Sequence, residues 1–317
     1  MAQPEASHNE MIGAFGFLTF VAVSKTLLTK FVFTHVATPV AFSVLSCLAT
    51  IIVMIPIFVV RPSYFGWIRR DMMVGFVGVS AAIAVDLACT NVAISELSVA
   101  MQQTIKATSP AATVMLEVAF TRKCHHPVIF MLIGLLCVGS VLVKYGSSAY
   151  DATVYGIVMM CVAVVSGAFK YVMAHTMIRS FRDDLGVLAF TFWVEVVVGF
   201  MLAPWAILNG EAEKLIFGDA ASNATDWALL WFTGAYGGVR IFSQFALLQH
   251  TSATTLALSN VTIQALTTIL GIFLFNTPVT NFLVAGVSVT LVATAGYTYV
   301  KTSKVLEAPE TKGKSLI

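Results

Sequence analysis

Residues 37–60 read ATPVAFSVLSCLATIIVMIPIFVV, a run of 24 residues that contains no charged side chain. An α-helix rises about 1.5 Å per residue, so about 20 apolar residues cross the hydrocarbon core of a bilayer. We therefore predict a transmembrane helix over residues 37–60. Comparable runs lie on both sides of it, and together they predict ten spans near residues 11–33, 37–60, 72–94, 97–120, 127–145, 153–178, 186–208, 227–248, 252–276 and 278–300.

The composition extends this prediction to the whole chain. Hydrophobic residues make up 58% of the 317 residues, charged residues make up 11%, and the mean hydropathy is +0.88, whereas a soluble domain is about one quarter charged. We predict an all-α membrane protein with one membrane domain over residues 11–302 and polar tails over residues 1–10 and 303–317. This leaves no room for a soluble catalytic or nucleic-acid-binding domain. The first ten residues lack a basic segment, so the first span is expected to act as a signal anchor.

Basic residues in the short loops predict the orientation, because cytosolic loops carry an excess of lysine and arginine. An even number of spans places both termini on one side. If that side is the cytosol, only Lys144 and Lys214 lie opposite, in agreement with the sequon Asn223-Ala224-Thr225 in the 209–226 loop. The cytosolic segments then hold eleven basic residues: Arg61, Arg69, Arg70, Arg122, Lys123, Arg179, Arg182, Lys301, Lys304, Lys312 and Lys314. We therefore expect cytosolic termini.

The two halves of the chain resemble each other. A shift of 140 positions lays Lys30 and His35 on Lys170 and His175. A shift of 158 positions lays four polar residues of the first half, Asp86, Asn91, Gln102 and Lys106, on four of the second, Gln244, Gln249, Asn260 and Gln264. Each half, about 11–145 and 153–302, holds five spans, so we predict two inverted five-helix repeats. Carriers with this architecture bind their substrates near the midplane, where the repeats meet.

Several charged residues fall inside the predicted spans. A charge at the centre of a bilayer costs about 2.5–3.5 kcal/mol on insertion scales, so such residues usually face a watery cavity, a partner or a ligand. The basic ones are Lys25, Lys30, Lys106, Lys170 and Arg240. The acidic ones are Asp86, Glu117 and Glu195, with Glu96 in the turn between the third and fourth spans. Because basic residues are in excess, a cavity that they share would attract anions.

Ten polar residues of the spans are predicted to bind the substrate: Lys25, Gln102, Gln103, Lys106, Lys170, Tyr171, Arg240, Gln244, Asn260 and Gln264. Lys106 is the strongest candidate, because Gln102 lies four positions before it and shares its helix face. Asn260 and Gln264 repeat that spacing in the ninth span. Arg240 could hold a phosphate through two donors, whereas a lysine offers a point charge.

Structural roles are the alternative for each of these residues. Lys106 could pair with Glu117. Lys170 or Arg240 could pair with one of the acids Asp86 and Glu195. Buried amides could join neighbouring helices instead of contacting a ligand. Lys30 lies near a helix end, where its ammonium group could extend to the membrane interface.

The sequence shows no pattern typical of a metal site, a cofactor site or an enzyme active site. The five cysteines have no CxxC spacing: Cys47, Cys89, Cys124, Cys137 and Cys161. His125 and His126 lack a third metal ligand nearby. HExxH, GxSxG and Walker motifs are absent as well. We therefore expect no metal ion, no cofactor and no enzymatic activity.

Several stretches of the chain form a recognisable pattern. The most specific is Gln103-Thr104-Ile105-Lys106-Ala107-Thr108-Ser109-Pro110. The others are Asn91-Val92-Ala93, Ser98-Val99, Ser24-Lys25-Thr26-Leu27-Leu28, Thr251-Ser252-Ala253-Thr254-Thr255 and Asn276-Thr277-Pro278-Val279. Together these stretches resemble the triose-phosphate/nucleotide-sugar translocator family of the drug/metabolite transporter superfamily. The resemblance covers most of residues 12–302. It implies ten helices in two inverted five-helix repeats, and exchange of phosphorylated solutes.

The resemblance implies an antiporter that exchanges a nucleotide sugar or sugar phosphate for a nucleotide or phosphate, in a Golgi or endoplasmic reticulum membrane. Its partners would be this small anionic metabolite, the counter-substrate and the lipid bilayer, with a homodimer left open. A plastid-type phosphometabolite translocator or a proton-coupled exporter is the alternative. One departure leaves the substrate open: relatives that handle triose phosphates carry a Lys-Arg pair in helix nine, where this chain has Val261-Thr262-Ile263-Gln264. Arg240 or Lys170 could supply the missing cation.

The predicted orientation can be tested with single cysteines in a variant from which the five native cysteines are removed. In sealed organelle vesicles with the cytosolic face outward, the Asn223→Cys variant should react with a membrane-impermeant maleimide only after detergent is added. The Lys312→Cys variant should react at once. Immediate labelling at position 223, with protection at position 312, would reverse the orientation.

Overall fold

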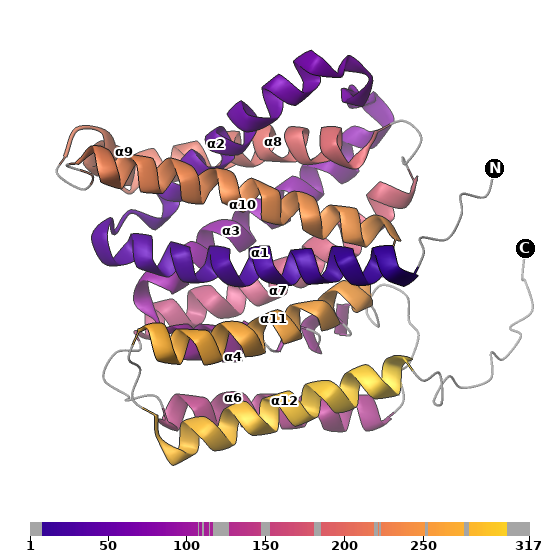
Figure 1. Ribbon diagram of the computed structural model, residues 1–317, viewed down its shortest axis with the longest axis vertical. Coiled ribbons are helices and arrows are strands. Elements are labelled where there is room, and N and C mark those ends of the chain that lie inside the picture. Colours follow the sequence, from indigo (N-terminus) through magenta and orange to yellow (C-terminus); the bar gives the residue numbers. More distant parts are fainter. Residues whose placement is uncertain are drawn as a thin grey trace, which may run out of the picture.

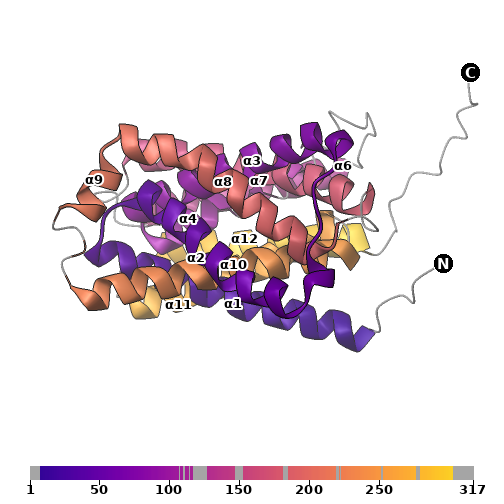
Figure 2. The ribbon, with the colours of Figure 1, turned by 90° about the horizontal axis from the view of Figure 1, so that it is seen from above.

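The computed structural model describes residues 8–106, 108–109, 111–113, 115–116, 127–146, 153–180, 185–218, 221, 223–250, 253–275 and 279–302. All regular secondary structure within these residues is helical, as predicted, and the long helices lie side by side in one bundle (Figure 1). Helix α1 begins and α12 ends at the same end of this bundle (Figures 1 and 2). Both described chain ends therefore lie on one side.

Most helices lie within a few residues of the predicted spans, whereas α4 covers only the first part of the predicted span 97–120. Their bounds are α1 His8–His35, α2 Pro39–Val60, α3 Met73–Glu96, α4 Val99–Lys106, α6 Pro127–Gly146, α7 Val154–Ser180, α8 Val187–Leu208, α9 Glu211–Ile216, α10 Ala224–His250, α11 Ala253–Leu274 and α12 Asn281–Thr302. Two short 3₁₀ turns, Pro62–Tyr64 and Arg70–Met72, connect α2 to α3. The predicted long loop 209–226 contains the short helix α9, at the end of the bundle opposite to where α1 begins (Figures 1 and 2).

Five helical segments of the described chain are long and apolar enough to cross a membrane: Gly13–His35, Pro39–Val60, Arg70–Glu96, Val154–Ile178 and Val187–Leu208. Each has at most two charged residues in its most apolar window. These segments make the chain an integral, multi-pass membrane protein. The full number of ten spans stays a prediction.

The carboxylate of Glu211 in α9 holds the start of α2. It accepts hydrogen bonds from the backbone N–H groups of Val40 and Ala41, at 2.6 and 2.9 Å. The first N–H groups of a helix have no partner within the helix, and Pro39 in the first turn has no N–H to satisfy. A carboxylate at this position is also favoured by the helix dipole. Helix α9 is therefore fixed to the bundle by capping a neighbouring helix.

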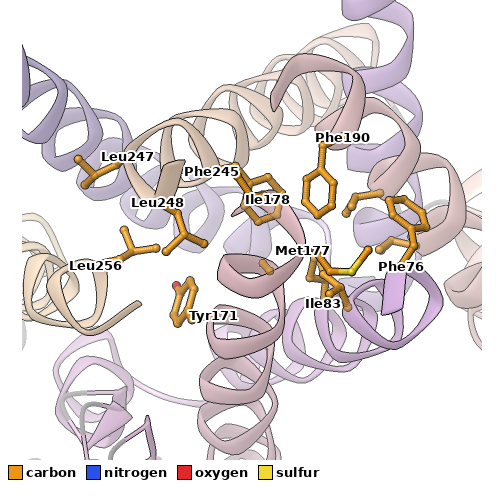
Figure 3. Close-up of a cluster of buried hydrophobic side chains, with 14 of the residues drawn as sticks. Phe76, Ile83, Tyr171, Met177, Ile178, Phe190, Phe245, Leu247, Leu248 and Leu256 are labelled. Carbon is orange, nitrogen blue, oxygen red and sulfur yellow. The ribbon is translucent and has the colours of Figure 1, made fainter. Parts of the chain in front are cut away.

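Two buried apolar clusters lie along the bundle. One lies where α1 meets α2 and includes Phe33, Phe42 and Leu230. The larger one extends toward the connection between α2 and α3 and includes Phe76 and Phe190, whose rings pack edge to face (Figure 3).

The main helix pairings follow a regular scheme. Let α1, α2, α3, α4 and α6 correspond in order to α7, α8, α10, α11 and α12. Helix α1 packs on α10, and the corresponding helix α7 packs on α3. Helix α2 also packs on α10, and the corresponding helix α8 packs on α3. In three further pairs, two corresponding helices pack on each other: α2 on α8, α4 on α11 and α6 on α12. Helices of the first set thus pack against the second set in equivalent ways.

Glycine allows the closest of these approaches. A Cβ atom on Gly238 of α10 would lie 2.3 Å from Oγ1 and 2.8 Å from Cβ of Thr50 in α2. Small residues commonly let membrane helices approach closely, because helix association there depends on van der Waals packing. Gly16 of α1, in contrast, has open space where its Cβ would be.

We expect the Gly238→Ala variant to lower the thermal unfolding midpoint of the purified protein in detergent. The added methyl group must push α10 away from α2, and such overpacking costs about 1–3 kcal/mol. The Gly16→Ala variant is the matched control and should keep the midpoint or raise it slightly, because alanine favours the helix. Equal midpoints for both variants would contradict the close packing of α2 on α10.

Candidate functional site

A polar cavity lies inside the bundle, next to the larger apolar cluster, with which its lining shares Ile83, Phe245 and Ile263. It is lined by residues of α1, α2, α3, α4, α7, α8, α10 and α11. Nine of the ten residues predicted to bind a substrate line it: Lys25, Gln103, Lys106, Lys170, Tyr171, Arg240, Gln244, Asn260 and Gln264. Residues far apart in the sequence therefore meet at one place. Substrate binding by them stays a prediction.

Helix periodicity and crossing explain why α4 and α11 contribute together. Asn260 and Gln264 are four positions apart and share one face of α11. The side-chain amide of Gln264 donates to the backbone carbonyl of Lys106 in α4 at 3.1 Å. Asn260 donates to the hydroxyl of Tyr171 in α7 at 3.1 Å. These amides both line the cavity and join helices, so the structural alternative holds for them as well.

Lys170 of α7 is paired with Asp86 of α3. Its ammonium group donates to the carboxylate of Asp86, which also accepts a hydrogen bond from the hydroxyl of Thr90 at 3.3 Å. The ammonium group further lies 4.7 Å from the centre of the Tyr171 ring. The charge of Lys170 is therefore compensated within the protein, which is the structural alternative foreseen for this residue.

Gly167 of α7 faces Asp86 of α3. A Cβ atom on Gly167 would lie 3.4 Å from a carboxylate oxygen of Asp86. Gly167 precedes Lys170 by three positions, so both face α3. A larger residue at position 167 would meet the carboxylate that Lys170 needs.

Three cations of the cavity have no ion pair within the described residues: Lys25, Lys106 and Arg240. Lys25 is 5% exposed, and its ammonium group lies 5.8 Å from the centre of the Phe42 ring. Glu117, the acid considered for Lys106, lies outside the described residues, as do Cys124, His125 and His126. Counting Lys170, the lining holds four cations against two acids, Asp86 and Glu195, and so has two positive charges in excess.

Gln102 and Lys30, two polar residues of the predicted spans, do not line the cavity. The amide of Gln102 donates to the backbone carbonyl of Leu97 at 2.9 Å. The ammonium group of Lys30 donates to the carbonyls of Ile94 and Leu97 at 2.8 and 2.9 Å. The last carbonyls of a helix have no partner within it, and these two side chains satisfy those of α3. Lys30 is therefore bound within the bundle instead of extending to the interface.

Other lining residues were missed from the sequence. They carry short polar groups on α1, α2, α3 and just beyond the end of α4: Thr26, Ser46, Thr50, Thr90, Asn91 and Ser109. Ser46 and Thr50 are four positions apart in a helix with no charged residue, which is a signal that could have identified them. Single hydroxyls are common in membrane helices, however, because they bond to the preceding turn, as Thr50 does to the carbonyl of Ser46 at 2.9 Å.

The comparisons with known proteins agree with one another. Residues 11–298 match the Triose-phosphate Transporter family. A probable sugar phosphate/phosphate translocator of Arabidopsis thaliana is 22% identical over 269 residues, which cover 78% of this chain and 63% of that protein. UDP-uronic acid transporter 1 of the same plant is 22% identical over 208 residues, covering 65% and 67% of the two chains. The chain thus spans less than two thirds of the length of the first of these relatives.

A solved crystal structure supports the fold. Its chain is 13% identical to this one and superposes with a TM-score of 0.65 over 92% of this chain and 99% of that chain. At this identity the similarity bears on the fold alone.

The Asp86–Lys170 pair predicts a specific pattern of stability. The Asp86→Asn variant leaves the buried ammonium group of Lys170 uncompensated, and breaking a buried ion pair in this way costs about 3–5 kcal/mol. The Asp86→Asn/Lys170→Gln double variant removes both charges and should recover most of the lost thermal stability. A double variant that is no more stable than the Asp86→Asn variant would contradict a direct pair.

Proposed function

Because the chain belongs to the Triose-phosphate Transporter family, we propose that it is a solute carrier that exchanges a nucleotide sugar or sugar phosphate for a nucleotide or phosphate across an organelle membrane. The observation that carries this proposal is the central cavity with two positive charges in excess. Buried charges without partners are costly. A doubly charged anion would neutralise the excess and make the closed cavity favourable.

The names of the relatives agree with an anionic sugar compound as substrate. One is a sugar phosphate/phosphate translocator and the other a UDP-uronic acid transporter. Both names describe solutes that combine negative charge with a sugar. We infer the same chemical class for this chain.

The cavity residues also offer a replacement for the cation that helix nine lacks. Arg240 of α10 lines the same cavity as Lys106, whereas Gln264 of α11 provides an amide. Lys170 is less suited to this role, because Asp86 already compensates it. We therefore assign the second phosphate contact to Arg240.

The arrangement of the helices supports a mechanism of alternating access. The equivalent pairings of the two helix sets support two inverted five-helix repeats, and the cavity lies where the sets meet. Carriers of this architecture expose a central site to each side in turn by rocking one repeat against the other. The cavity volume of about 100 Å³ is below the 300–1,000 Å³ or so of typical ligand sites. The repeats would have to separate to admit a nucleotide sugar.

For the location and the orientation in the membrane, we propose what the sequence predicts. A Golgi or endoplasmic reticulum membrane with cytosolic termini is the leading proposal, and a plastid-type phosphometabolite translocator is the alternative. A proton-coupled exporter is the second alternative, for which Glu195 and Asp86 provide carboxyl groups in the cavity. Uptake driven by pH without a counter-substrate would favour that alternative.

Reconstituted protein provides the test of the proposed function. In proteoliposomes loaded with counter-substrate, we expect the Lys106→Ala variant to lose nearly all exchange. The Arg240→Gln variant should bind a nucleotide or sugar phosphate at least about tenfold more weakly, since a hydrogen bond to a charged group is worth about 1.5–3 kcal/mol. Its affinity for the matching nucleoside or free sugar should change little.

The control is the Lys214→Ala variant, which removes an exposed lysine of α9 outside the cavity and should leave exchange unchanged. Binding is measured by thermal shift, because ligands that bind only the folded state raise the unfolding midpoint. Equal losses for charged and neutral ligands in the Arg240→Gln variant would show that Arg240 holds helices together. Exchange that survives in the Lys106→Ala variant would place the anion site elsewhere.

A further inference from the structure

The cavity contains buried polar atoms that have no hydrogen-bond partner among the described residues. Five of its lining residues carry one such atom each: Ser46 Oγ, Asn91 Oδ1, Glu195 Oε1, Arg240 Nε and Gln264 Oε1. Buried polar groups are nearly always bonded, to protein, water or ligand. Their concentration in one cavity therefore indicates where a ligand binds and which groups it must carry.

Most of these atoms are acceptors. The carboxylate oxygen of Glu195 and the amide oxygens of Asn91 and Gln264 can only accept, whereas Arg240 Nε can only donate and the Ser46 hydroxyl can do either. A fully ionised phosphate group satisfies Arg240 but offers no donor to the acceptors. The ligand must therefore carry hydrogen-bond donors in addition to its negative charge.

Glu195 is the group for which this demand is strongest. Its residue is 2% exposed, in the middle of α8, and it forms no ion pair with any described residue. The other acid of the cavity, Asp86, is held by Lys170. A carboxylate weakens an anion site electrostatically. Lys25 attracts this carboxylate and the Cys47 thiol lies within hydrogen-bonding reach of it, but Oε1 of Glu195 still lacks a hydrogen-bond partner among the described residues and can accept one from a ligand.

The surroundings of Glu195 suit a hydroxylated ligand. Ser46 Oγ of α2 and Glu195 Oε1 of α8 line the same cavity, and both lack partners. The two helices pack directly on each other. A carboxylate and a hydroxyl that line one cavity can each bind a hydroxyl of a sugar, because a hydroxyl both donates and accepts.

We propose that Glu195 is a specificity-determining residue, which accepts hydrogen bonds from hydroxyl groups of the substrate while Arg240 and Lys106 hold its anionic group. The inference rests on the proposed function and adds a requirement to it. The transported anion has a hydroxylated skeleton, and the chain selects it over an organic phosphate of equal charge without hydroxyls. Ser46 contributes to the same contact from α2.

Two matched ligand pairs test this inference on the purified full-length protein. Glycerol 3-phosphate and n-propyl phosphate share a three-carbon skeleton and one phosphate but differ in two hydroxyls. Uridine 5′-monophosphate and its 2′,3′-dideoxy analogue form the second pair. Thermal shift gives the affinity of each ligand, and inorganic phosphate serves as the anion without a skeleton.

For at least one pair, we expect the unchanged protein to prefer the hydroxylated member by about tenfold or more, the effect of a hydrogen bond to a charged group. In the Glu195→Gln variant this preference should fall to about threefold or less. The affinity for the hydroxyl-free member and for inorganic phosphate should stay the same or rise, because one negative charge is gone. These opposite changes separate hydrogen bonding from electrostatics.

The Ser46→Ala variant, which removes a hydroxyl without a partner and should fold normally, is expected to lose part of the same preference. A preference that survives in both variants, or a gain in affinity for all phosphates alike in the Glu195→Gln variant, would overturn the assignment. If the unchanged protein binds the phosphates but does not distinguish the pairs, the inference fails and the proposed function stands. If it binds no phosphate at all, both fail.

Discussion

A charge inside the membrane needs a partner, and this constraint decides where the functional site lies. The partner of Lys170 is the carboxylate of Asp86, and the partners of Lys30 are the backbone carbonyl groups at the end of α3. Lys25, Lys106 and Arg240 find no ion pair among the described residues, and all three line one cavity. The proposed substrate site is therefore the region in which the described residues do not compensate every charge.

The packing of the bundle places those charges together. Gly167 of α7 leaves room for the carboxylate of Asp86, and a Cβ atom on Gly237 of α10 would lie 3.4 Å from Cε of Lys25. Each glycine belongs to the second set of helices and faces a charged residue of the first set. A Cβ atom at either position would be in ordinary van der Waals contact with the charged side chain. Small residues at these positions thus let charged side chains of different helices line one cavity.

Much of this arrangement could be predicted from the sequence, because charge in an apolar span is rare. Lys106, Arg240 and the amide of Gln264 were identified in this way, and the structure brings them to one cavity. The partner of Lys170 could not be chosen, since the choice between Asp86 and Glu195 depends on how α3, α7 and α8 are rotated. That rotation is set by packing among many apolar residues of similar size, which the sequence pattern does not resolve.

Helix boundaries explain the remaining differences. Gln102 is four positions from Lys106, which suggested a shared role. Helix α4 begins at Val99, however, so Gln102 lies in its first turn, next to the free carbonyls of α3, and binds them. Lys106 lies one turn further into the membrane and reaches the cavity.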